Sequence, residues 1–358
     1  MSGLLAAIAL TISGSLDLQP VLDRLISEQD VPGMSAVVTH RGDVVYLGAS
    51  GVANIESGKR MAADTVLYAG SLSKIYTAVL VLKLVDDGKL SLSDRVGDIA
   101  GNDSPTILIS HLLTHSSGLV REGNFGYWFS ADFPDRDALK RFLAQTSLES
   151  TPGERVRYSN IGYAALGLTI EDRTGLTYRE ALKKYVLQPL GMQDSGSAGP
   201  IIGLAAGYTP KGRIIPSEER PFAGVGRQVG ERHRRDYYDA RAMSPAFGIF
   251  TTAEDLGRLA RFLLGYGGDL LPDELRTTLL SPQNGSRTYG LGAGTYRDRQ
   301  IARHSGWFAA HRSHILVDPE SGLAVAVLAN SDNANPGAAA RALLGAALDS
   351  GADGDSVN

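Results

Sequence analysis

Strand patterns lie near both ends of this chain, and helical patterns fill its middle. Residues 34–39 and 44–47 are rich in apolar and β-branched side chains and flank a glycine-containing turn, which predicts a β-hairpin. Residues 313–317 and 323–329 have the same character and flank a second turn of Asp, Pro, Ser and Gly. The pattern predicts an α+β fold. One antiparallel sheet is built from the N- and C-terminal segments and flanked by helices, and a mostly helical region is inserted between them.

Several segments have the apolar spacing of helices. Residues 71–87 are the strongest, because Ile75, Val79 and Leu82 recur on one face and Gly88 follows as a stop. The predicted helices cover residues 16–28, 71–87, 137–145, 161–173, 178–186 and 337–348. We expect a single domain over residues 17–347, with a sheet lobe at about 17–65 and 285–347 and a helical lobe at about 66–284.

The two ends of the chain leave its location open. The longest apolar run, residues 4–12, is followed by small residues but preceded by no Lys or Arg. It fits either the apolar core of an export signal or a helix packed on the body. No run approaches the roughly 18 apolar residues of a membrane span. Residues 350–358 predict a flexible tail. Both an exported and a cytoplasmic location of the protein remain open.

Composition excludes several classes of function. Lys and Arg number 35 against 39 Asp and Glu, so the net charge of −4 does not favour nucleic acid or an acidic membrane as a partner. Cysteine is absent, which removes disulfides, thiol nucleophiles and cysteine-ligated metals. Hydrophobic residues make up 43%, enough for a buried core, so an intrinsically disordered chain is excluded.

Two histidines four residues apart, His111 and His115, raise the question of a metal site. On a helix this spacing places both rings on one face, as zinc ligands require. Leu112 occupies the place of the glutamate base in a His-Glu-x-x-His pattern, and a Ser-Ser-Gly helix end follows. We therefore expect histidines that form structural hydrogen bonds rather than a metal site.

Ser71 and Lys74 stand three residues apart at the start of the strongest predicted helix. A serine hydroxyl attacks a carbonyl only after it loses its proton, and a lysine one turn along the same helix face can take it. The helix start also offers backbone N–H groups to an oxyanion. The alternative is an N-cap serine followed by a solvated surface lysine.

Tyr158 and Asn160 follow a turn-forming stretch. A tyrosine acts as a general base when a nearby cation lowers its pKa, and Lys74 is such a cation. Asn160 offers an amide that can bind the lysine or the substrate. Taken alone, the pair is also what an ordinary loop contains.

His304, Ser305 and Gly306 come shortly before the C-terminal hairpin. A glycine in a strand lets a substrate approach the backbone closely, and the N–H of Trp307 can serve as an oxyanion donor. His304 can orient a substrate or the tyrosine. The alternative is a structural histidine.

The Ser-x-x-Lys, Tyr-x-Asn and His-Ser-Gly motifs, in this order, resemble those of the serine β-lactamase and penicillin-binding-protein superfamily. The similarity is strongest to its class C β-lactamase-like branch, which includes family VIII carboxylesterases, D-Ala-D-Ala carboxypeptidases and D-aminopeptidases. It extends from about residue 17 to 347. Further stretches that carry it are residues 112–119, 152–163, 189–192, 251–256 and 289–292.

The resemblance implies the β-lactamase/transpeptidase fold and a role for each motif. Ser71 is the nucleophile that becomes acylated, and Tyr158, held anionic or polarised by Lys74, is the general base. The substrate and oxyanion group that the resemblance implies comprises Asn160, His304, Ser305, Gly306 and Trp307. No metal or organic cofactor takes part.

The expected function is hydrolysis of small esters, amides or peptides through an acyl-enzyme. His304 replaces the lysine of true class C β-lactamases, so a permanent cation for a substrate carboxylate is absent at this position. We therefore expect a carboxylesterase for short-chain, neutral acyl esters. The alternatives are a D-Ala-D-Ala carboxypeptidase or D-aminopeptidase, a weak β-lactamase, a peptide acyl transferase, and a non-catalytic binder of penicillin-like ligands. The oligomeric state stays open.

Two further segments bear on the pocket. Tyr127, Trp128 and Phe129 form an apolar group in a glycine-flanked loop, and we expect them to line the site as a wall for an acyl group. A satellite hydrophobic cluster is the alternative. Residues 220–241 mix Arg with acidic residues and predict a solvated long loop that serves as a lid.

Overall fold

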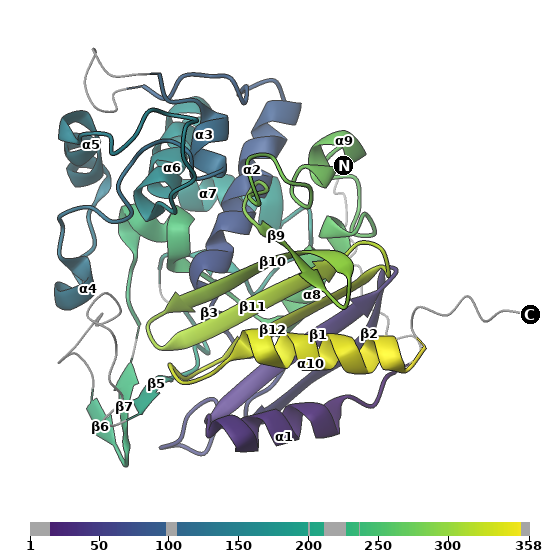
Figure 1. The fold of residues 1–358 in the computed structure, drawn as a ribbon. Helices are drawn as coiled ribbons and strands as arrows, with labels where there is room; N and C mark the ends of the chain where they lie inside the picture. The colour runs from purple at the N-terminus through teal and green to yellow at the C-terminus, as the bar shows by residue number, and fades with distance from the viewer. Residues whose placement is uncertain (1–14, 98–105, 200, 211–226, 236, 352–358) are drawn as a thin grey trace, which may run out of the picture.

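A six-stranded antiparallel sheet joins the two ends of the chain, as the sequence predicts (Figure 1). The computed structural model describes residues 15–97, 106–199, 201–210, 227–235 and 237–351. The strand order is β2-β1-β12-β11-β10-β9, so N-terminal β1 pairs directly with C-terminal β12. The strands are β1 (Gly33–His40), β2 (Asp43–Gly51), β9 (Gly292–Tyr296), β10 (Arg299–Phe308), β11 (His311–Asp318) and β12 (Leu323–Ala329).

Helices cover both faces of this sheet. Helices α1 and α10 pack on one face, and α8 and the helical lobe pack on the other (Figure 1). Strand β12 is buried along its whole length because it is covered on both faces, which explains its unbroken apolar sequence. The helices are α1 (Gln19–Gln29), α2 (Ser73–Asp86), α3 (Ile109–Leu113), α4 (Tyr127–Ser130), α5 (Arg136–Gln145), α6 (Asn160–Thr174), α7 (Tyr178–Leu182), α8 (Ala253–Leu263), α9 (Asp273–Thr277) and α10 (Pro336–Asp349).

The inserted lobe is built around α2, whose residues are buried from Ser73 to Leu82. A helix that is apolar on every side belongs in the interior, where α6 and two short π-helical turns surround it. These turns are η2 (Lys183–Leu187) and η5 (Ser244–Gly248), and the 3₁₀ turns are η1 (Gly70–Leu72) and η4 (Arg241–Met243).

Two small sheets in the inserted lobe were not expected from the sequence. One has the order β3-β8-β4 and the other β5-β7-β6. The prediction of a solvated loop over residues 220–241 is wrong for residues 227–235, which form a hairpin of β6 and β7, while residues 220–226 and 236 lie outside the described residues. The strands are β3 (Leu67–Tyr68), β4 (Gly196–Ser197), β5 (Gly207–Pro210), β6 (Arg227–Val229), β7 (Arg232–Arg235) and β8 (Ile249–Thr251).

The predicted N-terminal signal or helix and most of the predicted tail lie outside the described residues. Within the ranges that the structure describes, no helix is both apolar and long enough to cross a bilayer. The division into sheet and helical lobes at residues 65 and 285 stays a prediction.

Candidate active site

Ser71 lies in the 3₁₀ turn η1, immediately before α2 and against the last part of β10. Gly70 has the left-handed φ of 53°, and a Cβ there would lie 2.8 Å from the Gly306 carbonyl carbon and closer still to Trp307 N. A Cβ on Gly306 would lie 3.0 Å from Ser71 N. The two glycines therefore allow the backbone at Ser71 to meet the backbone at Trp307, which places the two predicted oxyanion donors side by side.

Lys74 is fully buried in α2, and its amine reaches three oxygen atoms. Nζ lies 2.8 Å from Asn160 Oδ1, 2.6 Å from the Ala246 carbonyl oxygen and 3.3 Å from Ser71 Oγ. Burial lowers the pKa of Lys74 well below its usual range, because the ammonium loses its hydration. A neutral amine has two N–H groups for Asn160 and Ala246, which leaves its lone pair for the Ser71 hydroxyl.

Tyr158 is packed between rings and cations. Its ring centroid lies 4.7 Å from Lys74 Nζ, 4.4 Å from the ring of His115 and 5.7 Å from the guanidinium of Arg121. Burial raises the pKa of Tyr158, and its hydrogen bond with Ser71 only partly opposes the rise. Of the two states that the resemblance implies for Tyr158, anionic or polarised, these directions favour the polarised, neutral phenol beside a neutral lysine.

Asn160 is the first residue of α6 and is positioned by the helix cap before it. The Ser159 hydroxyl accepts a hydrogen bond from Gly162 N at 2.9 Å, which fixes the helix start. From there, Asn160 Oδ1 faces Lys74 and Nδ2 donates to Glu122 Oε1 at 2.5 Å. The interaction of Asn160 with Lys74 is one of the two that the sequence suggested.

Glu122 is a site residue that the sequence interpretation missed. Its carboxylate accepts hydrogen bonds from Asn160 and from the Tyr127 hydroxyl, and burial raises its pKa. One signal was available: Arg121 and Glu122 form a charged pair directly after the apolar Leu119 and Val120, close to a stretch that resembles the family.

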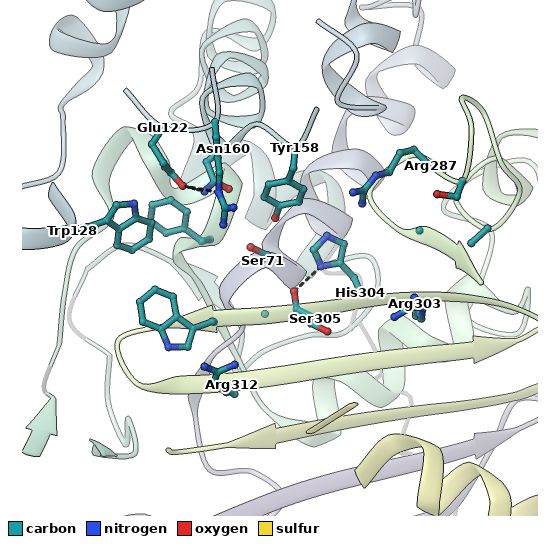
Figure 2. A pocket seen from close by; sticks show the side chains of 17 residues that line it. Ser71, Glu122, Trp128, Tyr158, Asn160, Arg287, Arg303, His304, Ser305 and Arg312 are labelled. Carbon is teal, nitrogen blue, oxygen red and sulfur yellow. Dashed lines mark hydrogen bonds and ion pairs between the residues drawn. The ribbon is translucent and has the colours of Figure 1, made fainter. Parts of the chain in front are cut away.

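The predicted third motif lies in the last half of β10, opposite Ser71 (Figure 2). Burial lowers the pKa of His304 to about 3, so the ring is neutral at pH 7. Ser305 Oγ lies 2.8 Å from His314 Nδ1 on the neighbouring strand β11, where the two residues are register partners. The Trp307 indole donates to Asp332 at 2.5 Å, which holds the ring at the sheet edge.

The two histidines considered for a metal do not share a helix face. His111 belongs to α3, but His115 lies beyond its end with a left-handed φ of 59°. His111 Nδ1 accepts from Leu108 N at 3.2 Å, and His115 Nδ1 accepts from Ser159 N at 3.1 Å. Both rings thus form structural hydrogen bonds. Among the described residues, no three His, Cys, Asp or Glu side chains gather as metal ligands would.

Ser71 opens into a cavity of about 800 Å³ between the helical lobe and β10 (Figure 2). One wall is aromatic: the Trp128 ring lies 5.0 Å from Phe247 and 5.6 Å from Trp307. Of the three residues predicted as a wall, Trp128 lines the cavity, Tyr127 is buried behind it, and the side chain of Phe129 lies outside the described part of the chain.

The lining of the cavity contains several permanent cations. It includes Arg121, Arg287, Arg303 and Arg312, against one acidic residue, Glu122. Arg287 comes from the segment before β9, and its guanidinium lies 5.7 Å from the Tyr158 ring centroid. Position 304 itself holds a histidine, but Arg303 beside it and Arg287 from a separate loop bring permanent cations into the same cavity. The lack of a cation at position 304 therefore does not exclude a substrate that carries a carboxylate.

Comparisons with known proteins agree with this geometry. A family model described as Beta-lactamase matches residues 18–349. Esterase EstB of Burkholderia gladioli is 30% identical over 334 residues, 84% of this chain and 80% of that protein. Penicillin-binding protein 4 of Amycolatopsis lactamdurans is 30% identical over 275 residues, 72% of this chain and 65% of that protein.

Solved structures share the fold. The D-amino acid amidase from Ochrobactrum anthropi SV3 superposes with a TM-score of 0.79 at 22% identity, over 93% of this chain and 98% of that chain. The octameric penicillin-binding protein homologue from Pyrococcus abyssi superposes with a TM-score of 0.73 at 27% identity, over 94% of this chain and 78% of that chain.

Proposed function

The chain belongs to the beta-lactamase family and is a serine hydrolase, and on that premise we propose that it cleaves carboxylic esters through an acyl-enzyme on Ser71. One observation carries the proposal: Ser71 Oγ lies 3.3 Å from the amine of a fully buried lysine. Burial keeps that amine neutral, so that it can accept the serine proton.

Proton transfer runs through Lys74 and Tyr158. Lys74 takes the Ser71 proton as Oγ attacks the ester carbonyl, and the Tyr158 hydroxyl, which is hydrogen-bonded to Ser71, passes a proton to the leaving alkoxide. In the second half of the reaction, the Tyr158 oxygen takes a proton from the water that attacks the acyl-enzyme, and Lys74 returns its proton to the Ser71 oxygen as the acyl group leaves. General acid–base help of this kind contributes about 10²–10⁴ in rate.

The developing oxyanion is stabilised by the backbone N–H groups of Ser71 and Trp307. Their proximity, which Gly70 and Gly306 permit, supports this role. Each such donor contributes about 10²–10³ to kcat, because it is oriented before the charge develops.

An uncharged acyl chain fits the aromatic side of the cavity. Trp128, Phe247 and Trp307 offer apolar surface next to Ser71, and His304 is neutral. A relative named as an esterase, 30% identical over most of this chain, supports the same substrate class.

A second candidate substrate class is a peptide or amide that carries a carboxylate. Arg287 favours this substrate class, because a guanidinium beside Tyr158 can pair with the carboxylate of the substrate. Relatives named as a penicillin-binding protein and a D-amino acid amidase keep this class open.

Labelling and turnover test the proposal together. The intact mass after incubation with a fluorophosphonate should rise by one adduct, and Ser71→Ala should abolish the adduct. An aryl butyrate should then be turned over faster than a D-Ala-D-Ala peptide or a cephalosporin. If either carboxylate substrate matches the ester in kcat/KM, the second candidate replaces the first. If the wild-type protein forms no adduct, the proposal of an acyl-enzyme on Ser71 is wrong.

A further inference from the structure

Glu122 accepts hydrogen bonds but does not touch Ser71, and its place in the network suggests a role beyond the proposed function. We propose that Glu122 is a positioning residue: it fixes the Asn160 amide with its oxygen toward Lys74, and so keeps the lysine lone pair free for Ser71. The inference rests on the proposed acyl-enzyme function and assigns a residue outside its motifs.

The two ends of the Asn160 amide differ in their hydrogen bonding. One end accepts hydrogen bonds and the other donates them. Asn160 presents its oxygen to Lys74 Nζ at 2.8 Å and its nitrogen to Glu122 Oε1 at 2.5 Å. An ionised carboxylate only accepts, so Glu122 permits one of the two amide orientations and rejects the other.

The reversed orientation would disable the base. An Asn160 amide turned by 180° would aim its NH₂ group at Lys74. A neutral Lys74 would then accept that hydrogen bond with its lone pair and direct an N–H at Ser71 Oγ instead. The amine that lies 3.3 Å from the nucleophile would donate to it rather than receive its proton.

The structure also fixes Glu122 itself. The hydroxyl of Tyr127 donates to Oε2, and Arg121 Nε lies 3.7 Å from Oε1. Tyr127 is only 1% exposed, and its ring packs against Phe133 at 5.0 Å. The carboxylate therefore has little freedom to follow the amide if the amide turns.

The carboxylate also contributes charge at Lys74. Its negative charge raises the pKa of Lys74, while Arg121 and Arg287 lower it, as does burial, the largest of these effects. Loss of the Glu122 charge should therefore lower the pKa of Lys74 further and extend activity to more acidic pH. The titratable and charged groups that face Lys74 are Glu122, Arg121, Arg287, Tyr158, Tyr163, His115 and His304.

The test uses Glu122→Gln, which keeps the size of the side chain. Its amide oxygen should accept from the Tyr127 hydroxyl as Oε2 does, which turns its NH₂ group toward Asn160 and favours the reversed Asn160 amide. We expect kcat for the best substrate to fall by about tenfold or more, with KM within threefold, since misplacement of a catalytic group affects chemistry more than binding. The acid limb of the kcat/KM profile should move to lower pH. Tyr127→Phe, which removes the hydroxyl that anchors Glu122, should give a smaller loss of the same kind.

The decisive variant is the double change Glu122→Gln with Asn160→Asp. The introduced glutamine can then donate to the introduced carboxylate, which accepts from both sides and has no wrong orientation. We expect kcat at alkaline pH to recover to within about threefold of wild type. The acid limb should lie above that of Glu122→Gln, because the new carboxylate raises the pKa of Lys74.

Each other outcome overturns the proposal. A kcat for Glu122→Gln within threefold of wild type would show that the amide needs no fixing. A rise in KM alone would show that Glu122 contacts the substrate. No recovery in the double variant, with native circular dichroism and thermal unfolding, would show that Glu122 is structural. Failure of the proposed function is seen separately, because wild-type protein would then form no fluorophosphonate adduct.

Discussion

The two walls of the cavity hold their functional groups in different ways. On the helical wall, Lys74 and Asn160 are buried and Tyr158 is partly buried, and their side chains form the proposed proton-transfer network. On the sheet wall, β10 offers the backbone at Trp307 and a neutral His304. The function of the helical wall therefore depends on the identity of its side chains. The function of the sheet wall depends on the close approach of the backbones at Ser71 and Trp307.

The largest expected effect is on the nucleophile of the helical wall. Ser71→Ala should abolish turnover and fluorophosphonate labelling and leave the fold intact. Ser73→Ala is the matched control: it removes two buried hydrogen bonds, to Gly70 O and from Ile249 N, and should cost about 1–3 kcal/mol of stability without loss of labelling. More than a few per cent of activity in Ser71→Ala would exclude Ser71 as the nucleophile.

The next effect concerns the proton-transfer pair. Lys74→Ala and Tyr158→Phe should each lower kcat by about 10²–10⁴, and the double variant should lose little more, because the two residues act as one unit. Tyr158→Phe keeps the ring that packs at 4.4 Å on His115, so thermal unfolding should change little. Multiplicative losses in the double variant would show that Lys74 and Tyr158 act independently.

The fold and the chemistry of the motifs follow from local patterns. Residues 323–329 are apolar throughout because β12 is covered on both faces, and α2 is apolar all round because it is the centre of a lobe. The order of Ser71, Lys74, Tyr158 and His304 along the chain was enough to indicate the superfamily. These features depend on neighbours in sequence, which a single sequence displays.

Glu122 and Arg287 could not be placed in this way. Each reaches the cavity from a loop, and no periodic pattern around either marks it as part of a site. The hairpin at residues 227–235 was missed for a similar reason, since its basic residues have no apolar alternation. Long-range proximity of polar loop residues depends on the folded backbone, which local sequence patterns do not display.

The sheet wall is tested by the glycine behind it. Gly70→Ala should lower kcat by about 10²–10³, because the new Cβ would push the backbone at Trp307 away from Ser71 and separate the oxyanion donors. Gly88→Ala is the control, since Gly88 has a similar φ of 66° but no atom within 4 Å of the added Cβ. It should cost about 1 kcal/mol of stability and leave kcat unchanged. Equal kcat in both variants would argue against a donor pair at this wall.

The pH dependence distinguishes the ionisable groups of the two walls. Neutral Lys74 is the base, so kcat/KM should fall as the pH drops through its lowered pKa, by about tenfold per pH unit below it. His304, with its pKa of about 3, should add no inflection near pH 6.5. Between the lowered pKa of Lys74 in the folded chain and its ordinary pKa in the unfolded chain, only the unfolded chain binds a proton at this residue. The free energy of unfolding should therefore rise with pH across this range. A kcat/KM that rises towards acidic pH would contradict a neutral lysine base.

The smallest effect concerns substrate charge at the junction of the two walls, where Arg287 lies 5.7 Å from the Tyr158 ring. Arg287→Gln should lower kcat/KM for a D-Ala-D-Ala peptide by about tenfold, the scale of one charge-assisted hydrogen bond. The same peptide with an amidated C-terminus, and an aryl butyrate, should change by less than about threefold, since neither presents a carboxylate to the guanidinium. Arg297→Gln removes the same charge from an exposed arginine that pairs with Asp349 outside the cavity, and it controls for net charge. Equal losses for acid and amide would mean that Arg287 supports Tyr158 by packing and does not select substrates by charge.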